Sequence, residues 1–311
     1  MAFMPALAKF LDFQDAQECA RVRAITKEQI TDHANPDFQI RVIEDAAEFY
    51  GAFATDIVMR IMQARDEGRQ CVLILPVGPV PQYAVAAGII NRLGIDCSHV
   101  VTFNMDEYAN EDGIAAPADW PHGFMYSMLR HFYSEIDPDL RPPREQVHGP
   151  NHENIGYYGK QLAGLGGADC CYSGPGWTGH LAFIEPDCPE FDAPLAEWMK
   201  MGPRIATLSP FTIAQNSLHG SFGMSGDLTA VPPKAATIGP AEVVGAKRRI
   251  DMHAITVDGS QASWQRLVSR LCLHGPVTPK LPSSLHQLLR TDVWLSEAIA
   301  QDIEPRWDKG Y

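Results

Sequence analysis

The feature of this sequence that most constrains its fold is a series of short, continuous apolar runs separated by segments of helix length. Residues 71–75 (CVLIL) and 99–103 (HVVTF) are two such runs, and they are typical of parallel strands covered on both faces. Because strands that alternate with helices form parallel sheets with right-handed crossovers, the sequence predicts a doubly wound, mainly parallel, Rossmann-like α/β fold flanked by helices. The other strand candidates are residues 38–43, 168–172, 235–238, 252–257 and 292–295.

The helices and the domain boundaries follow from the same pattern. Apolar residues recur at helical spacing between residues 49 and 62, and a second helix is expected over residues 82–93. Residues 1–37 have mixed polarity and end in a turn-like cluster, so we interpret them as an N-terminal extension of a single domain, residues 38–311. Residues 186–234 are rich in Pro, Gly and Ser, which favours a lid or binding loop over a linker.

Composition and charge exclude several classes of function. The 311-residue chain has 25 basic and 38 acidic residues, a net charge of 25 − 38 = −13. Since no basic stripe is visible, we do not expect it to bind nucleic acid. Seven cysteines, an odd number in a long chain, indicate reduced thiols and a cytoplasmic location. CxxC and HExxH motifs are missing, so we predict no metal site, and we expect no cofactor.

Neither a signal peptide nor a membrane span is expected. The first 30 residues have no basic segment leading into an apolar run. Residues 71–90 are uncharged and long enough to cross a bilayer, but Pro76, Pro79 and Pro81 would break a helix there. We interpret this stretch as a buried strand, a loop and the start of a helix.

Polar residues follow two of the predicted strands at the point where each strand ends. Asp106 and Glu107 come after the second apolar run, and His180 and Glu185 come after residues 168–172. Parallel strands bring such loops to one edge of the sheet, where ligands bind. Two vicinal carboxylates raise the pKa of at least one of them, which suits a general base, and a histidine oriented by a carboxylate can move a proton. The alternative readings are a solvated turn or a helix cap for Asp106 and Glu107 and a buried core histidine for His180, and spacing alone favours them.

Two segments favour the catalytic roles over these structural alternatives. Residues 100–108 (VVTFNMDEY) and 179–186 (GHLAFIEP) resemble the characteristic VTFNMDEY and GHIAFNEP segments of the glucosamine-6-phosphate deaminase family. The resemblance extends over residues 39–298. It implies that Asp106 shuttles a proton between C2 and C1 of an open-chain amino sugar, and that His180, oriented by Glu185, assists ring opening. The related 6-phosphogluconolactonases share the Gly-His pair but not the Ala-Phe-x-Glu-Pro run.

The sequence departs from the family pattern where the ligand would bind. The family has Asn-Asp where Trp177 and Thr178 precede Gly179 here, and threonine cannot serve as a carboxylate base near pH 7. We expect Trp177, Thr178 and Gly179 to contact substrate, as we do Glu107. Trp177 either stacks on a sugar face or packs under the lid.

The phosphate-binding residues of the family are also changed. Its Pro-Thr-Gly-Gly-Thr-Pro loop is PVGPVP here, which puts Val77 and Gly78 at the expected site. Its arginine and lysine are replaced by Leu218 and Ala262. Each charge-assisted hydrogen bond contributes about 1.5–3 kcal/mol, so a standard 6-phosphate is not the expected substrate. The cations that could replace the lost ones are Lys234, Lys247 and Arg204.

We therefore predict a divergent aldose–ketose isomerase or deaminase that acts on an amino sugar or a related sugar. Two alternatives stay open. One is a lactonase-type hydrolase, in which His180 activates water, and the other is a sugar-binding homologue without catalysis. The expected partner is a small sugar, and the family resemblance implies a homo-oligomer.

Overall fold

The computed structural model describes residues 7–77, 81–254, 264–305 and 307. Seven of its strands form one parallel sheet in the order β1-β10-β9-β6-β2-β3-β5. The expected α/β fold is therefore confirmed. The bounds of these strands are Phe38–Ile43 (β1), Cys71–Leu75 (β2), Val100–Asn104 (β3), Val147–His148 (β5), Cys170–Ser173 (β6), Arg248–His253 (β9) and Thr291–Ser296 (β10).

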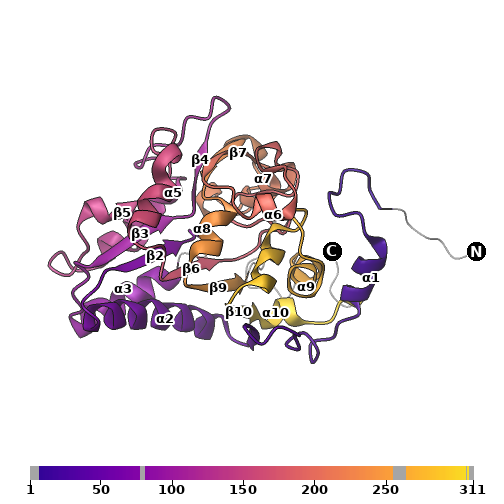
Figure 1. The fold of residues 1–311 in the computed structure, drawn as a ribbon, viewed down its shortest axis with the longest axis horizontal. Helices are drawn as coiled ribbons and strands as arrows, with labels where there is room; N and C mark the ends of the chain where they lie inside the picture. Colours follow the sequence, from indigo (N-terminus) through magenta and orange to yellow (C-terminus); the bar gives the residue numbers. More distant parts are fainter. Residues whose placement is uncertain (1–6, 78–80, 255–263, 306, 308–311) are drawn as a thin grey trace, which may run out of the picture.

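Helices cover both faces of this sheet (Figure 1). On one face, α2 (Ala46–Asp66) and α3 (Pro81–Leu93) bury apolar side chains against β2 and β3. On the other face, α5 (Ile155–Gly164) and α8 (Pro240–Gly245) pack on the same strands and on β6. Strands buried on both sides need apolar side chains in both directions, which explains why every residue of β2 is buried.

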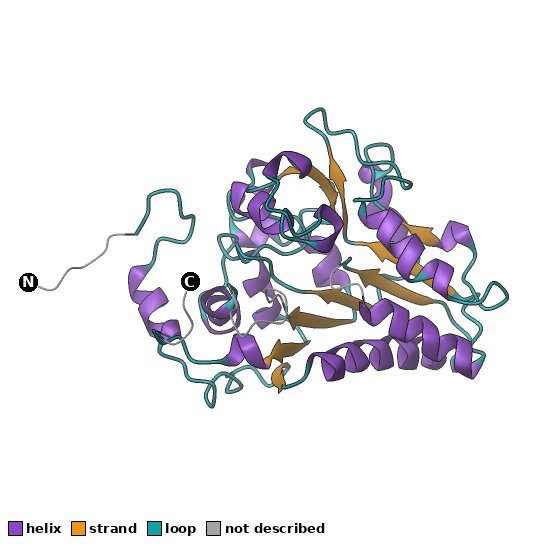
Figure 2. Cartoon of the chain, turned by 180° about the vertical axis from the view of Figure 1, so that it is seen from behind, coloured by secondary structure: helices purple, strands orange, loops and turns teal. Residues whose placement is uncertain are grey.

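A second, smaller sheet forms where the chain leaves β3 (Figure 2). It is antiparallel, in the order β4-β8-β7, with bounds Asp106–Ala109 (β4), Lys234–Thr237 (β8) and Arg204–Thr207 (β7). The expectation that residues 235–238 belong to the parallel sheet is wrong. Their apolar run is long enough for a strand, but β8 pairs with β4 rather than with the parallel strands. Asp106 and Glu107 thus begin a strand rather than lie in a loop.

Other boundaries shift by a few residues. β9 begins four residues earlier than expected, and the far end of its predicted range, Val257, lies outside the described residues. Residues 186–234 hold several short elements, and their action as a lid stays a prediction. Those elements are α6 (Leu195–Trp198), β7, α7 (Pro210–Asn216) and the 3-10 turns Pro189–Phe191, Gly220–Phe222 and Leu228–Ala230.

The N-terminal segment packs on the end of the sheet that carries β1. Helix α1 (Ala16–Arg23) lies against α9 (Arg266–His274) (Figure 1). Val22 and Ile30 are fully buried there. The remaining helical elements are α4 (Phe124–His131), α10 (Glu297–Ala300) and the 3-10 turns Tyr133–Glu135, Arg144–Gln146 and Pro282–Leu288.

Candidate active site

Asp106 is the first residue of β4, directly beyond the end of β3. Its side chain is buried, and within the described part of the chain no side chain or backbone group forms a hydrogen bond or ion pair with its carboxyl. Burial raises the pKa of Asp106 well above its ordinary value, and the neighbouring Glu107 charge raises it further. A buried carboxyl with no protein partner and a raised pKa is suited to exchange a proton with a ligand.

Glu107, in contrast, has partners for both carboxyl oxygens. Its Oε1 accepts hydrogen bonds from the backbone N–H groups of Tyr108 and Phe124, both at 2.9 Å, and its Oε2 accepts one from Met125 at 2.7 Å. Burial raises the pKa of Glu107, and these three N–H donors oppose that rise. Because two of the donors open α4, Glu107 caps this helix from a neighbouring strand. These hydrogen bonds give Glu107 a structural role, and its contact with substrate stays a prediction.

His180 lies in the loop after β6 and is joined to Glu185 through Thr178. The Thr178 hydroxyl donates to Oε2 of Glu185 at 2.8 Å, and Thr178 Oγ1 lies 3.1 Å from Nδ1 of His180. The imidazole Nδ1 is also 3.4 Å from the same Glu185 oxygen. Threonine therefore occupies the centre of the relay, and the predicted pairing of His180 with Glu185 is present in the geometry.

The hydrogen-bond pattern assigns the histidine tautomer. A hydroxyl has a single proton, and that of Thr178 is directed to Glu185. Thr178 Oγ1 must then accept from His180, which places the imidazole hydrogen on Nδ1. The Nε2 lone pair of a neutral imidazole is left for a ligand, since no described residue forms a hydrogen bond with that atom.

Glycines shape the loop around this histidine. A Cβ on Gly176 would lie 2.2 Å from Nε2 of His180, so only glycine allows the imidazole to occupy its position. Gly179 has φ +80° and its backbone faces Val268 and Cys272, which likewise excludes a larger residue. Gly179 thus has a role in loop geometry, and its contact with substrate stays a prediction.

Asp106 and His180 are linked through the small sheet. Asp106 lies opposite Thr237 in the β4–β8 ladder, and Thr237 Oγ1 accepts a hydrogen bond from the N–H of Phe183 at 3.1 Å. The Phe183 ring in turn packs against the imidazole of His180, with ring centroids 5.9 Å apart. The antiparallel sheet thereby brings the two polar segments to one region at the edge of the parallel sheet.

The other residues that were predicted to contact substrate lie in different parts of the structure. Trp177 is 39% exposed and packs against Trp264 and Phe211, with centroids 4.8 and 6.4 Å away. Val77 is half-buried and packs on the cluster between the sheet and α2 and α3. Leu218 lies in the turn after α7. Gly78 and Ala262 lie outside the described residues.

The three cations considered as replacements for the lost ones are engaged elsewhere. Lys234 donates to the backbone carbonyl of Glu111 at 2.7 Å, and Lys247 pairs with Asp169 at 2.8 Å. Arg204 donates to backbone carbonyls of residues 190 and 202. Lysine has three N–H donors and arginine has five, so these bonds occupy only some of the donors of each side chain.

Two residues near His180 were not foreseen. Thr212 on α7 has its Oγ1 3.0 Å from Nδ1 of His180, a second hydroxyl on the same nitrogen. Burial, with a smaller contribution from His180, lowers the pKa of His219 to about 4, so His219 is neutral at physiological pH. Both lie in residues 186–234, where no sequence periodicity singles out a polar side chain, so sequence reasoning had no signal for either.

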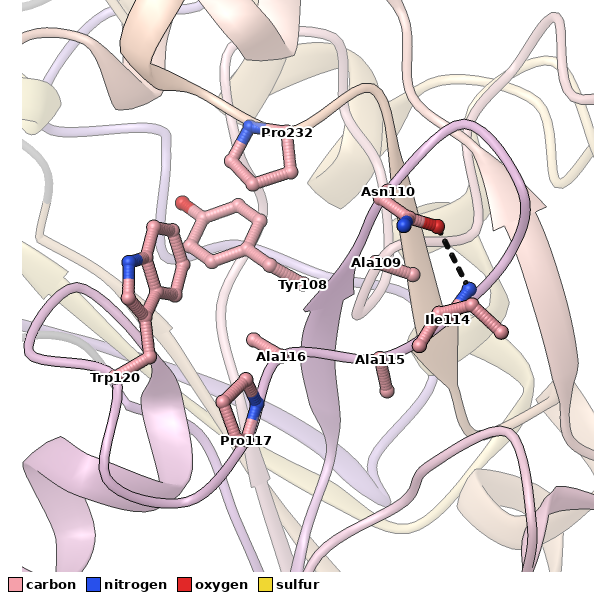
Figure 3. A pocket seen from close by; sticks show the side chains of 9 residues that line it. All are labelled: Tyr108, Ala109, Asn110, Ile114, Ala115, Ala116, Pro117, Trp120 and Pro232. Carbon is pink, nitrogen blue, oxygen red and sulfur yellow. Dashed lines mark hydrogen bonds between the residues drawn. The ribbon is translucent and has the colours of Figure 1, made fainter.

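A pocket of about 280 Å³ lies beside β4, away from these residues (Figure 3). Its wall is mainly apolar, and it includes Tyr108, Trp120 and Pro232. The Asn110 side chain at its rim accepts a hydrogen bond from the N–H of Ile114. No predicted site residue lines it.

Comparison with known proteins identifies the family. No family model matches the chain. A glucosamine-6-phosphate deaminase of Caenorhabditis elegans is 32% identical over 213 residues, which are 66% of this chain and 72% of the relative. The chain belongs to the glucosamine-6-phosphate deaminase family. A deaminase of the same name from Mannheimia succiniciproducens is 28% identical over 73% of this chain and 77% of its own length.

Several solved structures share the fold of this chain. A monomeric glucosamine-6-phosphate deaminase has a TM-score of 0.68 at 20% identity, covering 84% of this chain and 98% of the other. A 6-phosphogluconolactonase from Leishmania guyanensis has a TM-score of 0.60 at 14% identity, covering 86% and 98%. Family membership supports an enzyme of the glucosamine-6-phosphate deaminase family, and the lactonase structure shares the fold. Among the described residues, no helix combines the length and apolarity that crossing a bilayer requires.

Proposed function

We propose that this chain is an aldose–ketose isomerase or deaminase that acts on an amino sugar or a related sugar, and that its substrate is not a standard 6-phosphate. The observation that carries the proposal is the Asp106 carboxyl, which is buried, has a raised pKa and lacks a bonding partner among the described residues. Removing a proton from carbon beside a carbonyl requires a carboxylate held in this way.

The proposed reaction begins on the open-chain sugar. The Asp106 carboxylate takes the proton from C2, next to the C1 carbonyl, and the electrons of the C–H bond form the enediol-type intermediate. Returning the proton to C1 leaves C2 as an imine carbon. Water adds to that carbon and ammonia leaves, which yields the ketose.

Ring opening falls to His180 in this proposal. Nδ1 is held by two hydroxyls and lies near Glu185, while Nε2 is open to a ligand. The imidazole can then move a proton between the anomeric hydroxyl and the ring oxygen. Thr178 and Glu185 orient the ring.

The substrate class follows from the charges around the site. The two cationic positions of the family are Leu218 and Ala262, and the three candidates for replacement bond to other groups of the protein. A dianion would be held without the charge-assisted bonds that normally bind it. A neutral or singly charged sugar fits this composition better.

A lactonase reaction is the second candidate, supported by the same open Nε2 of His180. In that case the imidazole takes a proton from water, whose oxygen attacks a lactone carbonyl, and the ring oxygen leaves as a hydroxyl. Asp106 would have no proton to shuttle. The homo-oligomer, the cytoplasmic location and the lid at residues 186–234 stay predictions.

The deciding experiment is turnover of D-glucosamine by the full chain and by Asp106→Asn. We expect ammonia and a ketose from the parent, and a loss of about 10²- to 10⁴-fold in the variant because the base is gone. Since Asp106 must be ionised and its pKa is raised, the rate of the parent should fall with acidification well above the ordinary carboxyl range. Ammonia release is followed by a coupled assay between pH 4 and 9.

The exposed Asp119→Asn serves as the matched control and should leave the rate unchanged. An equal rate in Asp106→Asn would remove Asp106 as the base. Hydrolysis of a sugar lactone that is insensitive to Asp106→Asn would favour the lactonase, and tight sugar binding without turnover would favour the non-catalytic homologue.

A further inference from the structure

Two buried side-chain amides at the ends of β2 and β3 have no assigned role. Gln82 in the first turn of α3 is 1% exposed, and Asn104 at the end of β3 is 0% exposed. Neither amide oxygen nor amide nitrogen of either side chain forms a hydrogen bond within the described part of the chain. Buried amides almost always have partners, so a pair without them calls for an explanation.

The fold places the two amides in one layer. Asn104 pairs with Leu75 across the β2–β3 ladder, and the Tyr83 hydroxyl donates to the carbonyl of Pro76, which holds the first turn of α3 against the end of β2. Gln82 shares a helix face with Ala86, and Asn104 shares a strand face with Val100. Ala86 and Val100 belong to the same core cluster. Gln82 and Asn104 therefore lie just beyond that cluster, between α3 and β3.

This position adjoins the proposed base. Asn104 precedes Asp106 by two residues, and two residues of extended chain span at most about 7 Å. The backbone positions of Asn104 and Asp106 are therefore closer together than the length of a sugar molecule.

We propose that Gln82 and Asn104 form a subsite for uncharged hydroxyl groups of the sugar, which makes Gln82 a residue that determines specificity; this rests on the proposed function. A primary amide offers two N–H donors and one acceptor oxygen. A hydroxyl both donates and accepts, so it satisfies both halves of each amide. A phosphate dianion only accepts, and it would leave both amide oxygens without a donor. The subsite thus selects a polyhydroxylated end of the substrate over a phosphorylated one.

The test compares Gln82→Met, which keeps the length of the side chain, with Gln287→Met. The Gln287 amide donates to the carbonyls of Cys272 and Gly275 and so has its partners within the protein. Binding of D-glucosamine and of glucosamine 6-phosphate is measured by calorimetry on the full chain carrying Asp106→Asn, so that the sugar is not consumed. Thermal midpoints are measured without ligand.

We expect Gln82→Met to weaken D-glucosamine binding by about tenfold and to raise the thermal midpoint, because it removes an amide that has no partner in the free protein. Gln287→Met should lower the thermal midpoint and leave the affinity for D-glucosamine unchanged. The full chain that carries Asp106→Asn alone should bind D-glucosamine more tightly than glucosamine 6-phosphate.

A lower midpoint in Gln82→Met, an unchanged affinity for D-glucosamine, or tighter binding of the 6-phosphate would each overturn the subsite. Absence of ammonia release by the parent would refute the deaminase reaction alone. The subsite would still be supported by the paired changes in affinity and midpoint.

Discussion

At position 178 a hydroxyl stands where the family pattern has a carboxylate. A threonine hydroxyl can donate and accept hydrogen bonds but cannot act as a base near pH 7. We therefore expect Thr178 to orient the imidazole of His180 rather than to transfer a proton. Its hydrogen bonds place the imidazole hydrogen of His180 on Nδ1. In the proposed function, Thr178 is therefore a positioning residue that links His180 to Glu185.

Removal of that hydroxyl alone should impair catalysis. We expect Thr178→Val to lower kcat on the ring form of the sugar by about 10- to 100-fold, within the range that general acid–base catalysis contributes. Thr178→Ser, which keeps the hydroxyl, should restore most of the rate. Both are measured by ammonia release, with KM reported separately. Equal loss in the valine and serine variants would contradict the orienting role.

At the scale of elements, the connection between β4 and α4 shows how a site residue is held. Glu107 joins the small sheet to the N-terminus of α4 through two backbone N–H groups of that helix. Gly123 precedes this helix without a side-chain cap of its own. The strand that carries Asp106, the proposed base, is thereby tied to a neighbouring helix.

Glu107→Gln should destabilise this connection. One carboxylate oxygen is replaced by an N–H₂ group that faces a backbone donor, so we expect a loss of about 1.5–3 kcal/mol in the free energy of unfolding. Denaturant unfolding measures it, with the exposed Glu153→Gln as the control. If Glu107→Gln instead kept full stability and raised KM, a direct contact of Glu107 with substrate would be indicated.

At the scale of the whole molecule, the N-terminal segment is part of the packed structure. Ile30 is buried with Leu273 of α9 and Val293 of β10. The guanidinium of Arg270 is buried and donates to backbone carbonyls near both chain ends, among them those of Ile25 and Ala300. The segment joins the last helices to the sheet.

Truncation of Ile30 should therefore destabilise the whole domain. We expect Ile30→Ala to lower the free energy of unfolding by about 2–5 kcal/mol, as for other large-to-small changes in a core. The exposed Glu28→Ala is the control. A single cooperative transition with an unchanged midpoint in Ile30→Ala would show that the segment folds apart from the domain.

Much of this architecture could be predicted because buried parallel strands leave a clear trace in the chain. Residues 71–75 are apolar without interruption, since both faces of β2 are covered. The antiparallel strand β4 has no such trace: its first two residues are carboxylates, and they are buried only because β8 and α4 surround them. Residues 235–238 do form an apolar run, but such a run does not reveal which strand it pairs with, and β8 lies in the antiparallel sheet.

The sequence by itself determined the parallel α/β fold, the family and the segments that carry Asp106 and His180, because those features depend on local patterns of residues. Only the tertiary structure decided that Glu107 caps a helix, that Thr178 joins His180 to Glu185, and that the amides of Gln82 and Asn104 have no hydrogen-bond partner among the described residues. Each of these depends on which groups from distant parts of the chain come within hydrogen-bond distance, and that follows from packing rather than from any run of neighbouring residues.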